Sequence, residues 1–453
     1  MTRPPWPLAN FKTGVPGAVW PPALHGAPAN LAALLWQLEE SQWLAPEALA
    51  ARQAAQLVEV ARWCRAHSPK FRQRMQAAGV GPDDLAAPGG MASLPVLTRR
   101  DVQQSEGLFC DAVPEGQGPV GEARTSGATG EPVVVRRTAL NLFDWRAFGV
   151  RRHLWQGVDV RLGFCAIRAN VFEAQRFDHW QGAISLLFDT GPFLALPITR
   201  DAAELARDLE HFGPGLLMLY PSTLAALVAA CEASGRTLPC VRFVQTIGET
   251  LSADTRAAAE RFFGVTVSDC YSSQELGYIA LQCPGGGLHT TETMIVEVLR
   301  TDGGPCAPGE VGRVVATDLR NFATPLFRYD TGDYAEVGAP CACGRGLPTL
   351  KRVVGRERNL MLMPDGTRHW PLVGFSAFRD IAPVVQYQLV QEAPLAVEVR
   401  LVVERSLSGF EETALGKHIQ SALGHPFALR FSYFEGRLPI GPNGKFEEFV
   451  SRV

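Results

Sequence analysis

The sequence predicts an α/β fold: a large layered α/β N-terminal domain that starts with a helical extension, followed by a small α+β C-terminal domain. Three observations support this prediction. The first eighty residues have a helical pattern, short apolar runs alternate with helical stretches from about residue 120, and the segments become hairpin-like after about residue 290. A length of 453 residues suits two or three domains.

The extension is predicted over residues 1–90 from two amphipathic runs. Leu31, Leu34, Leu35 and Leu38 recur at spacings of three and four, as they do on one face of a helix. Pro46 begins a second helix that runs to about His67. Both helices are interpreted as packing elements.

The middle of the chain is predicted to alternate strands with helices. One helix carries clear end signals, because Ser252 can cap the body Ala253–Phe263 and Gly264 can terminate it. The predicted strands are the short apolar runs Val133–Arg136, Gly163–Ile167, Leu194–Ile198, Leu216–Tyr220, Val241–Ile247 and Val265–Ser268.

The last third is predicted to contain strands and hairpins and then a small separate domain. We place the domain boundary near residues 356–359, which gives domains of 1–356 and 357–453. The predicted strands are Val311–Leu319, Leu326–Tyr329, Met361–Met363, Thr367–Trp370, Val385–Val390, Ala396–Val403 and Ala428–Phe434, and the predicted helices are Phe375–Ile381 and Phe410–Leu423.

Composition excludes several classes of protein. Lys and Arg number 43 against 46 Asp and Glu, so the net charge of −3 argues against nucleic-acid binding through bulk charge and against a polybasic membrane tether. Ten cysteines are too few for a disulfide-built scaffold. The N-terminal segment has no apolar core of a signal peptide, and Pro214, Gly215 and Pro221 interrupt the uncharged stretch 212–231. We therefore expect a cytoplasmic protein with no membrane partner.

A loop of small and hydroxylated residues precedes the strand predicted at Val133–Arg136. Small residues let the backbone approach an anion, and exposed N–H groups and hydroxyls bind phosphate oxygens. No Gly-Lys-Ser/Thr follows, so the loop is not a Walker A motif. It reads Arg124-Thr125-Ser126-Gly127-Ala128-Thr129-Gly130-Glu131-Pro132.

This loop resembles the phosphate-binding signature of the adenylate-forming superfamily, which includes acyl-CoA synthetases, aryl-CoA ligases and peptide-synthetase adenylation domains. Five further segments match that family's pattern in the same order. They are Gly248-Glu249-Thr250-Leu251, Tyr271-Ser272-Ser273-Gln274-Glu275, Tyr329-Asp330-Thr331-Gly332-Asp333, Gly355-Arg356-Glu357-Arg358-Asn359 and Pro439-Ile440-Gly441-Pro442-Asn443-Gly444-Lys445.

The resemblance implies a role for each matched position. Thr125, Ser126, Gly127, Thr129 and Gly130 would hold the phosphates of ATP, and Gly248, Glu249 and Thr250 would line the adenine and acyl pockets. Tyr271 would pack on adenine, Glu275 would hold Mg²⁺, and Asp333 would accept hydrogen bonds from the ribose hydroxyls. Arg356 would touch ribose or phosphate, Arg358 falls on the hinge position, and Lys445 would reach the acyl carboxylate and the α-phosphate. Thr129, Glu275 and Lys445 are thus the implied catalytic residues.

Two positions depart from the family's pattern. Ser272 stands where Gly is usual, and Gln274 stands where Thr or Ser is usual. The second change removes a hydroxyl expected at phosphate, although an amide can still donate a hydrogen bond. These departures are the support for an alternative, a catalytically dead nucleotide-binding protein.

The short chain and its helical start look like the phenylacetate–CoA ligases and the related coenzyme F390 synthetase group. So does the run Cys341-Ala342-Cys343-Gly344-Arg345 before the hinge. Cys283, His289, Cys341 and Cys343 offer three thiolates and one imidazole, a tetrahedral set for structural Zn²⁺. The alternative is buried free cysteines beside an unrelated histidine. The subgroup also implies a homodimer.

The function implied is activation of a carboxylic acid, of aryl or similar type, by ATP, with pyrophosphate released and the acyl group passed to a thiol, with CoA as the expected acceptor. The small domain would turn about residues 356–359 between the two half-reactions. Alternatives for the acceptor are the phosphopantetheine of a separate acyl carrier protein and an amine. Residues proposed to shape the acid pocket are the segment 163–198 with Arg168 and Arg176, and Tyr220, Pro221 and Ser222.

Overall fold

The computed structural model describes residues 11–104, 106–124, 132–356, 359–369, 375–436, 438–439 and 446–453. The chain divides into two compact units. The first comprises Met1–Phe164, Arg176–Phe193 and Ser268–Val354, and the second comprises Cys165–Gln175, Leu194–Val267 and Gly355–Val453. The chain passes for the last time from the first unit to the second between Val354 and Gly355, next to the predicted boundary at residue 356. The second unit also includes two earlier segments of the chain. The division into domains 1–356 and 357–453 stays a prediction.

Helices form the start of the first unit, as the sequence predicts. The segment carrying Phe327 packs against them, and the rings of Phe71 and Phe327 lie 4.4 Å apart. This apolar contact fixes the helical extension against the residues that precede Tyr329. The helices are α1 (Gly26–Ser41), α2 (Pro46–His67), α3 (Pro69–Ala78), α4 (Pro82–Ala86), α5 (Gly90–Ser93) and α6 (Arg99–Gln103).

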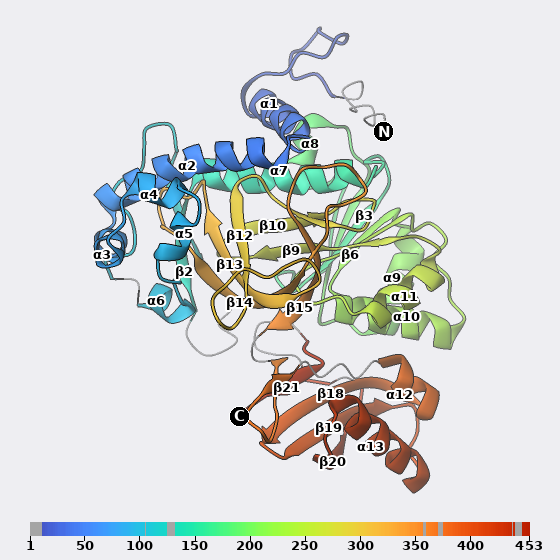
Figure 1. Cartoon of the computed structure of the whole chain (residues 1–453). Coiled ribbons are helices and arrows are strands. Elements are labelled where there is room, and N and C mark those ends of the chain that lie inside the picture. The colour runs from blue at the N-terminus through green and yellow to red at the C-terminus, as the bar shows by residue number, and fades with distance from the viewer. Residues whose placement is uncertain are drawn as a thin grey trace. The chain divides into compact units, whose positions relative to one another are not determined.

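A seven-stranded sheet forms the body of the first unit, with strand order β12-β13-β14-β15-β11-β10-β9. Helix α7 (Ala139–Trp155) packs along this unit against β10 and α1 (Figure 1). The strands are β9 (Cys270–Ser273), β10 (Gly277–Gln282), β11 (Leu288–Thr290), β12 (Met294–Leu299), β13 (Val311–Asp318), β14 (Tyr329–Val337) and β15 (Thr349–Arg356). The same unit contains the short helix α8 (Ile184–Leu187) and a hairpin of β1 (Val120–Arg124) and β2 (Val134–Thr138).

The strand predicted at Leu326–Tyr329 is wrong in its position, because β14 begins only at Tyr329. Arg328 has a φ of 51°, in the left-handed region, which interrupts an extended strand before Tyr329. Further along, Val315 pairs with Asp330 and Arg313 pairs with Tyr334, so residues 331–333 form a bulge opposite Val314. Gly332, with a φ of 72°, allows the turn within this bulge.

A six-stranded sheet has the order β4-β5-β3-β6-β7-β8, and most of its residues belong to the second unit. Helix α11 (Ala253–Phe263) has the predicted bounds, and Ser252 caps it by accepting from the backbone N–H of Thr255. The other elements are β3 (Phe164–Arg168), β4 (Gln175–Phe177), β5 (Phe193–Pro197), β6 (Leu216–Leu219), β7 (Phe243–Thr246), β8 (Val267–Ser268), α9 (Ala202–Phe212) and α10 (Pro221–Ser234).

The C-terminal residues of the second unit form the predicted α+β arrangement. A four-stranded sheet of order β20-β19-β18-β21 has α12 and α13 beside it (Figure 1). Phe378, Leu401 and Leu415 lie in its apolar core. The elements are β16 (Met361–Leu362), β17 (Arg368–His369), α12 (Phe375–Ile381), β18 (Val384–Ala393), β19 (Ala396–Val403), α13 (Gly409–Leu423), β20 (Ala428–Tyr433) and β21 (Phe449–Ser451).

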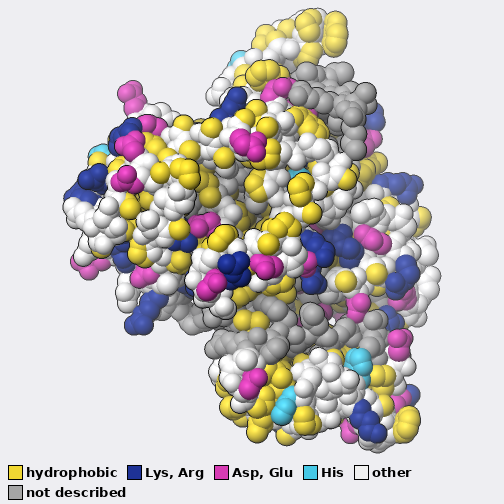
Figure 2. All heavy atoms as spheres, in the orientation of Figure 1, with side chains coloured by type: hydrophobic (Ala, Val, Ile, Leu, Met, Phe, Trp, Pro, Cys, Tyr) yellow, Lys and Arg dark blue, Asp and Glu magenta, His cyan; other side chains and the backbone are white. Residues whose placement is uncertain are grey.

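The surface shows the balanced charge of the sequence. Figure 2 shows acidic and basic side chains interspersed over the visible face. Among the residues that the structure describes, none of the helices has the length and apolar character needed to cross a bilayer.

A buried ion pair ties three segments of the first unit together. Arg151 of α7 binds Glu292 through two contacts, Nη1 to Oε2 at 2.6 Å and Nη2 to Oε1 at 3.0 Å. Arg151 Nη2 also donates to the Leu38 carbonyl at 3.0 Å, and Ser41 Oγ donates to Glu292 Oε1 at 2.7 Å. The two side chains are 4% and 10% exposed, so each charge depends on the other for its solvation.

Replacing Glu292 by Gln should therefore lower the free energy of unfolding by about 3 kcal/mol, because Arg151 would keep a buried charge without its counter-ion. Urea denaturation of the full-length protein measures this. The control is Glu59→Gln, which removes an exposed partner of Arg62 and should cost less than about 1 kcal/mol. Equal effects of the two variants would contradict the assigned role of the buried pair.

Candidate active site and metal centre

Three predicted site elements lie outside the described residues: the loop residues Thr125, Ser126, Gly127, Thr129 and Gly130, the hinge residue Arg358, and Lys445. The strands on either side of the loop are described, and they pair antiparallel up to Arg124 and Val134. The loop therefore joins two neighbouring strands of a hairpin.

Glu275 lies in the turn between β9 and β10. Leu276 N donates to Ser273 Oγ at 3.1 Å across this turn. Gly277 ends it with a φ of 78°, and a Cβ there would lie 3.3 Å from the Trp145 ring, so the turn requires glycine. The backbone thus places Glu275 in a site where only 10% of its side chain is exposed to solvent.

Two groups from distant parts of the sequence contact Glu275. The Tyr329 hydroxyl donates to Glu275 Oε1 at 3.4 Å, and Arg99 Nη1 donates to the same oxygen at 3.2 Å. Burial raises the pKa of the Tyr329 hydroxyl, and the charge of Glu275 raises it further. The tyrosine therefore stays protonated and acts as a donor to the carboxylate.

Asp333 lies in the bulge of β14, and a second tyrosine orients it. The Tyr271 hydroxyl is 2.7 Å from Asp333 Oδ2 and 3.1 Å from Thr331 Oγ1. Asp333 N donates to Thr331 Oγ1 at 3.1 Å, and Thr331 Oγ1 donates to the Val314 carbonyl at 3.0 Å. The Tyr271 hydroxyl and the bulge thus fix the position of a buried carboxylate. The structure brings Tyr271 and Asp333 together, as it does Glu275 and Tyr329.

Arg137 is a positioning residue that the sequence analysis missed. Its Nη2 donates to the Gln274 carbonyl, next to Glu275, and its guanidinium lies 4.5 Å from the centre of the Trp145 ring. The side chain is buried, and Asp318 supplies a facing negative charge. Burial raises the pKa of Asp318 to about 6. The buried guanidinium of Arg137 thus holds Gln274 in place. The motif of residues 271–275 could not reveal this contact, because Arg137 lies far from it in the sequence.

Arg328 is a second residue that the motifs did not identify. Its Nε donates to Glu297 Oε2 at 3.0 Å, and its Nη1 donates to the carbonyls of Ala92 and Leu94 at 3.0 and 2.8 Å. Its backbone N–H donates to Thr317 Oγ1 at 2.9 Å. These bonds hold the left-handed residue from which β14 begins.

Gly248, Glu249 and Thr250 follow β7 in the second unit, and Gly248 has a φ of 76°. Glu249 Oε2 accepts a hydrogen bond from Ser222 N at 3.0 Å, at the start of α10. Thr250 is exposed. Glu249 therefore holds a strand-to-helix turn against the first turn of a neighbouring helix.

The face of this sheet opposite α9, α10 and α11 carries polar groups near the carboxyl ends of β3 and β7. Alternate residues of each strand pack in the apolar core with these helices, which leaves Arg168, Met218 and Gln245 on the other face. Arg168 Nη1 lies 3.6 Å from Met218 Sδ. Gln245 is 1% exposed, and neither of its amide atoms has a partner among the described residues. Ligands of open α/β sheets bind at this edge.

Arg356 ends β15, and its backbone N–H donates to Asn359 Oδ1 at 3.0 Å. The Asn359 amide in turn donates to the Phe449 carbonyl of β21. The predicted hinge segment is thus bonded to the sheet of the C-terminal residues.

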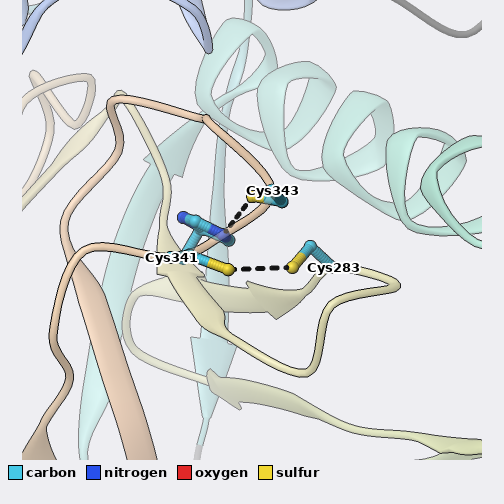
Figure 3. Close-up of side chains that lie close together, drawn as sticks. Cys283, Cys341 and Cys343 are labelled. Atoms are coloured by element: carbon cyan, nitrogen blue, oxygen red, sulfur yellow. Dashed lines mark hydrogen bonds between the residues drawn. The ribbon is translucent and has the colours of Figure 1, made fainter. Parts of the chain in front are cut away.

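The predicted metal ligands come together in the first unit. The ligand atoms of Cys283, His289, Cys341 and Cys343 all lie within 4.8 Å of one another. Cys283 Sγ is 3.6 Å from Cys341 Sγ, and Cys343 Sγ is 3.2 Å from His289 Nε2 (Figure 3). Tetrahedral zinc with ordinary bond lengths separates two sulfurs by about 3.8 Å and a sulfur from a nitrogen by about 3.5 Å. The four residues therefore fit a zinc ion.

The surroundings of the four residues also suit a metal. His289 Nδ1 lies 3.2 Å from the Leu347 carbonyl, so a proton on Nδ1 leaves Nε2 as the ligand atom. Burial lowers the pKa of His289 to about 4, which keeps the ring neutral. Burial and the neighbouring Cys343 and Cys341 together raise the pKa of the Cys283 thiol to about 12, so a bound metal would have to displace its proton. A Cβ on Gly287 would lie 3.0 Å from Cys341 Sγ, so glycine leaves room for the thiol.

Comparison with known proteins agrees with the motifs. No family model matches the chain. The phenylacetate-coenzyme A ligase of Escherichia coli strain K12 is 26% identical over 325 residues, which cover 67% of this chain and 70% of the relative. The enzyme of the same name from Thermus thermophilus is 24% identical over 380 residues, or 80% and 83% of the two chains.

Solved structures show the same fold. A 2-hydroxyisobutyryl-CoA ligase in the postadenylation state, with an acyl-AMP bound, has a TM-score of 0.71 at 17% identity and covers 91% of both chains. An anthranilate CoA ligase with anthranoyl-AMP has a TM-score of 0.54 at 18% identity, with 72% of this chain and 65% of the other covered. In sequence this chain is similar to the phenylacetate-coenzyme A ligases, and in fold it is similar to solved CoA ligases.

Proposed function

We propose that this protein joins a carboxylic acid to a thiol in two steps, with ATP as the source of energy and CoA as the acceptor. The observation that carries the proposal is the pair of oriented carboxylates in the first unit. Glu275 and Asp333 each accept a hydrogen bond from a tyrosine, and both stand at motif positions of the adenylate-forming enzymes. The names of the similar proteins support the same reaction class.

In the first step, an oxygen of the substrate carboxylate attacks the α-phosphorus of ATP. The bond from that phosphorus to the bridging oxygen breaks, and pyrophosphate leaves with the electron pair. In the second step, a thiolate attacks the acyl carbon and AMP leaves. Both steps need positioning and electrostatic stabilisation rather than a nucleophile from the protein.

The residues have separate tasks in this scheme. Asp333 would accept hydrogen bonds from the ribose hydroxyls, in the orientation set by Tyr271. Glu275 would hold Mg²⁺, which supplies positive charge to the phosphate oxygens when bound. Residues 125–130 would bind the departing pyrophosphate, and Lys445 would neutralise charge on both reacting groups.

The decisive experiment is a pyrophosphate-release assay over a panel of carboxylic acids, with phenylacetate, anthranilate and 2-hydroxyisobutyrate included. Acids with polar substituents belong in the panel because Gln245 offers a buried amide without a partner among the described residues. The best acid is then tested with CoA, with a phosphopantetheine-bearing carrier protein and with amines. Thioester formation with CoA supports the proposal, and release of pyrophosphate with none of the acids contradicts it.

Tyr271→Phe should weaken AMP binding about tenfold, because the aromatic ring remains while the donor that orients Asp333 is lost. Isothermal titration with AMP measures the effect. The control is Tyr433→Phe at the end of β20, which removes an exposed hydroxyl that donates to the carboxylate of Glu412 on α13. AMP affinity equal in Tyr271→Phe and the wild type would argue against ribose binding by Asp333.

Lys445→Ala should reduce pyrophosphate release at least about a hundredfold, because removing a charged group that acts in the transition state costs several kcal/mol. Thioester formation from a preformed acyl-adenylate should be spared, since that step would proceed after the small domain has turned. Lys417→Ala on α13, an exposed lysine, is the control. Equal loss of both half-reactions would contradict the two-position scheme.

We also propose that Cys283, His289, Cys341 and Cys343 hold a structural zinc ion. Four protein ligands leave no open position for catalysis. The support is the distance match in the cluster and the neutral imidazole.

Purified protein should contain about one zinc ion per chain by elemental analysis. Cys341→Ser should lose the metal and lower the melting temperature by at least about 5 °C. Cys240→Ser, which changes an exposed cysteine outside the cluster, should retain both properties. Negligible zinc in protein expressed with ample zinc would dispose of the metal site.

A further inference from the structure

A cation from the start of α6, Arg99, lies beside Glu275. Arg99 is 176 positions from Glu275 in sequence, and its Nη1 is 3.2 Å from Glu275 Oε1. The two partners differ in exposure, since 35% of the Arg99 side chain and 10% of the Glu275 side chain meet solvent. Part of the Arg99 side chain is therefore exposed to solvent, from which an incoming anion can approach it.

The backbone holds Arg99 in place from both sides. Leu97 N donates to the Arg328 carbonyl at 2.8 Å, and Asp330 N donates to the Leu97 carbonyl at 2.9 Å. Thr98 and Asp101 then cap the start of α6 reciprocally, at 2.9 and 3.2 Å. Arg99 thus follows a segment that pairs with β14, the strand of Tyr329 and Asp333. This pairing fixes the backbone position from which the Arg99 side chain extends.

Arg137 provides the contrast. It also lies near Glu275, but it is 6% exposed, donates to the Gln274 carbonyl and stacks on Trp145. Its guanidinium is committed to the protein. Arg99 is the more exposed of the two cations and can change partners.

A change of partner follows from the chemistry proposed for Glu275. A carboxylate that binds a divalent cation gains a much stronger counter-ion than a guanidinium, which weakens its attraction for Arg99. The planar guanidinium then matches phosphate oxygens, to which it donates two parallel hydrogen bonds. The anion that arrives with the metal is the polyphosphate of ATP.

We propose that Arg99 binds the β- and γ-phosphates of ATP, an inference that rests on the proposed function. When the magnesium complex of ATP enters, Arg99 leaves Glu275 and binds these phosphates instead. The same contact stabilises the pyrophosphate as it leaves, because charge grows on its oxygens when the bond to the α-phosphorus breaks. Helix α6 thereby contributes a catalytic residue to the site.

The test compares full-length wild type, Arg99→Met and Arg99→Lys by isothermal titration with three probes. These are α,β-methylene-ATP with Mg²⁺, pyrophosphate with Mg²⁺, and AMP. The methylene bridge prevents cleavage, so the identity of the acid is not needed. Arg100→Met is the matched control, an exposed arginine at the next position of α6.

Arg99→Met should bind α,β-methylene-ATP and pyrophosphate at least about tenfold more weakly, the low end expected for a charge-assisted hydrogen bond. Its affinity for AMP should stay within about twofold of wild type, because AMP lacks the β- and γ-phosphates. Arg99→Lys should bind these two probes with an affinity between those of wild type and Arg99→Met. A lysine supplies the positive charge but not the two parallel hydrogen bonds of a guanidinium. Arg100→Met should match wild type.

Three other outcomes would overturn the inference, and each can be told from the others. Unchanged binding of all three probes by Arg99→Met would show that Arg99 does not touch the phosphates, while the proposed function stands. Equal weakening for AMP and α,β-methylene-ATP would assign Arg99 a purely structural role. A wild type that binds none of the three probes would overturn the proposed function itself.

Discussion

The arrangement of the first unit depends on one residue held in an unfavourable backbone conformation. Arg328 has a left-handed φ of 51°. A residue with a Cβ adopts this conformation only when its surroundings compensate for the backbone strain. Its guanidinium supplies that compensation through Glu297 and the carbonyls of Ala92 and Leu94. Since Arg328 is 5% exposed, losing any of these partners would leave a buried charge partly unsolvated.

This one constraint orders both sides of the site. On one side, β14 starts directly after Arg328, so Tyr329 reaches Glu275 and the bulge carries Asp333. On the other side, the Arg328 carbonyl pairs with Leu97, which brings Arg99 to the same carboxylate. Segments that are far apart in sequence thus meet because one arginine binds to both.

The sequence predicted those parts of the structure whose signals are local. Ser252 and Gly264 defined α11 to the residue because capping and left-handed termination depend on neighbours in the chain. The four metal-ligand candidates could be named because thiols and imidazole are rare and chemically distinctive. Arg99 and Arg137 could not be found, since an arginine carries no local sign of the carbonyl or carboxylate it will meet. The strand placed at Leu326–Tyr329 failed for the same reason: apolar alternation says nothing of Arg328 and its distant partners.

The cluster of Cys283, His289, Cys341 and Cys343 is connected to the helical extension through Arg345 and Gly346, which follow Cys343. Arg345 follows Cys343 by two positions, and its guanidinium lies 4.9 Å from the centre of the Trp43 ring and 4.4 Å from that of Trp155. Its Nε donates to Gln42 Oε1 at 2.7 Å, and Gly346 N donates to the Gln42 carbonyl at 2.9 Å.

An ion held by the four ligands would fix the loop from which Arg345 extends, and with it the end of α1 at residues 41–43. The segment between α1 and α6 is then attached at both ends: just after α1 by Arg345, and just before α6 by the pairing of Leu97 with β14. A segment attached at both ends loses freedom in between, and these two attachments add to the apolar contact of Phe71 with Phe327. Together they give Arg99, which follows Leu97 closely, a defined position. A structural metal held by these four ligands would in this way help to position a residue of the proposed nucleotide site.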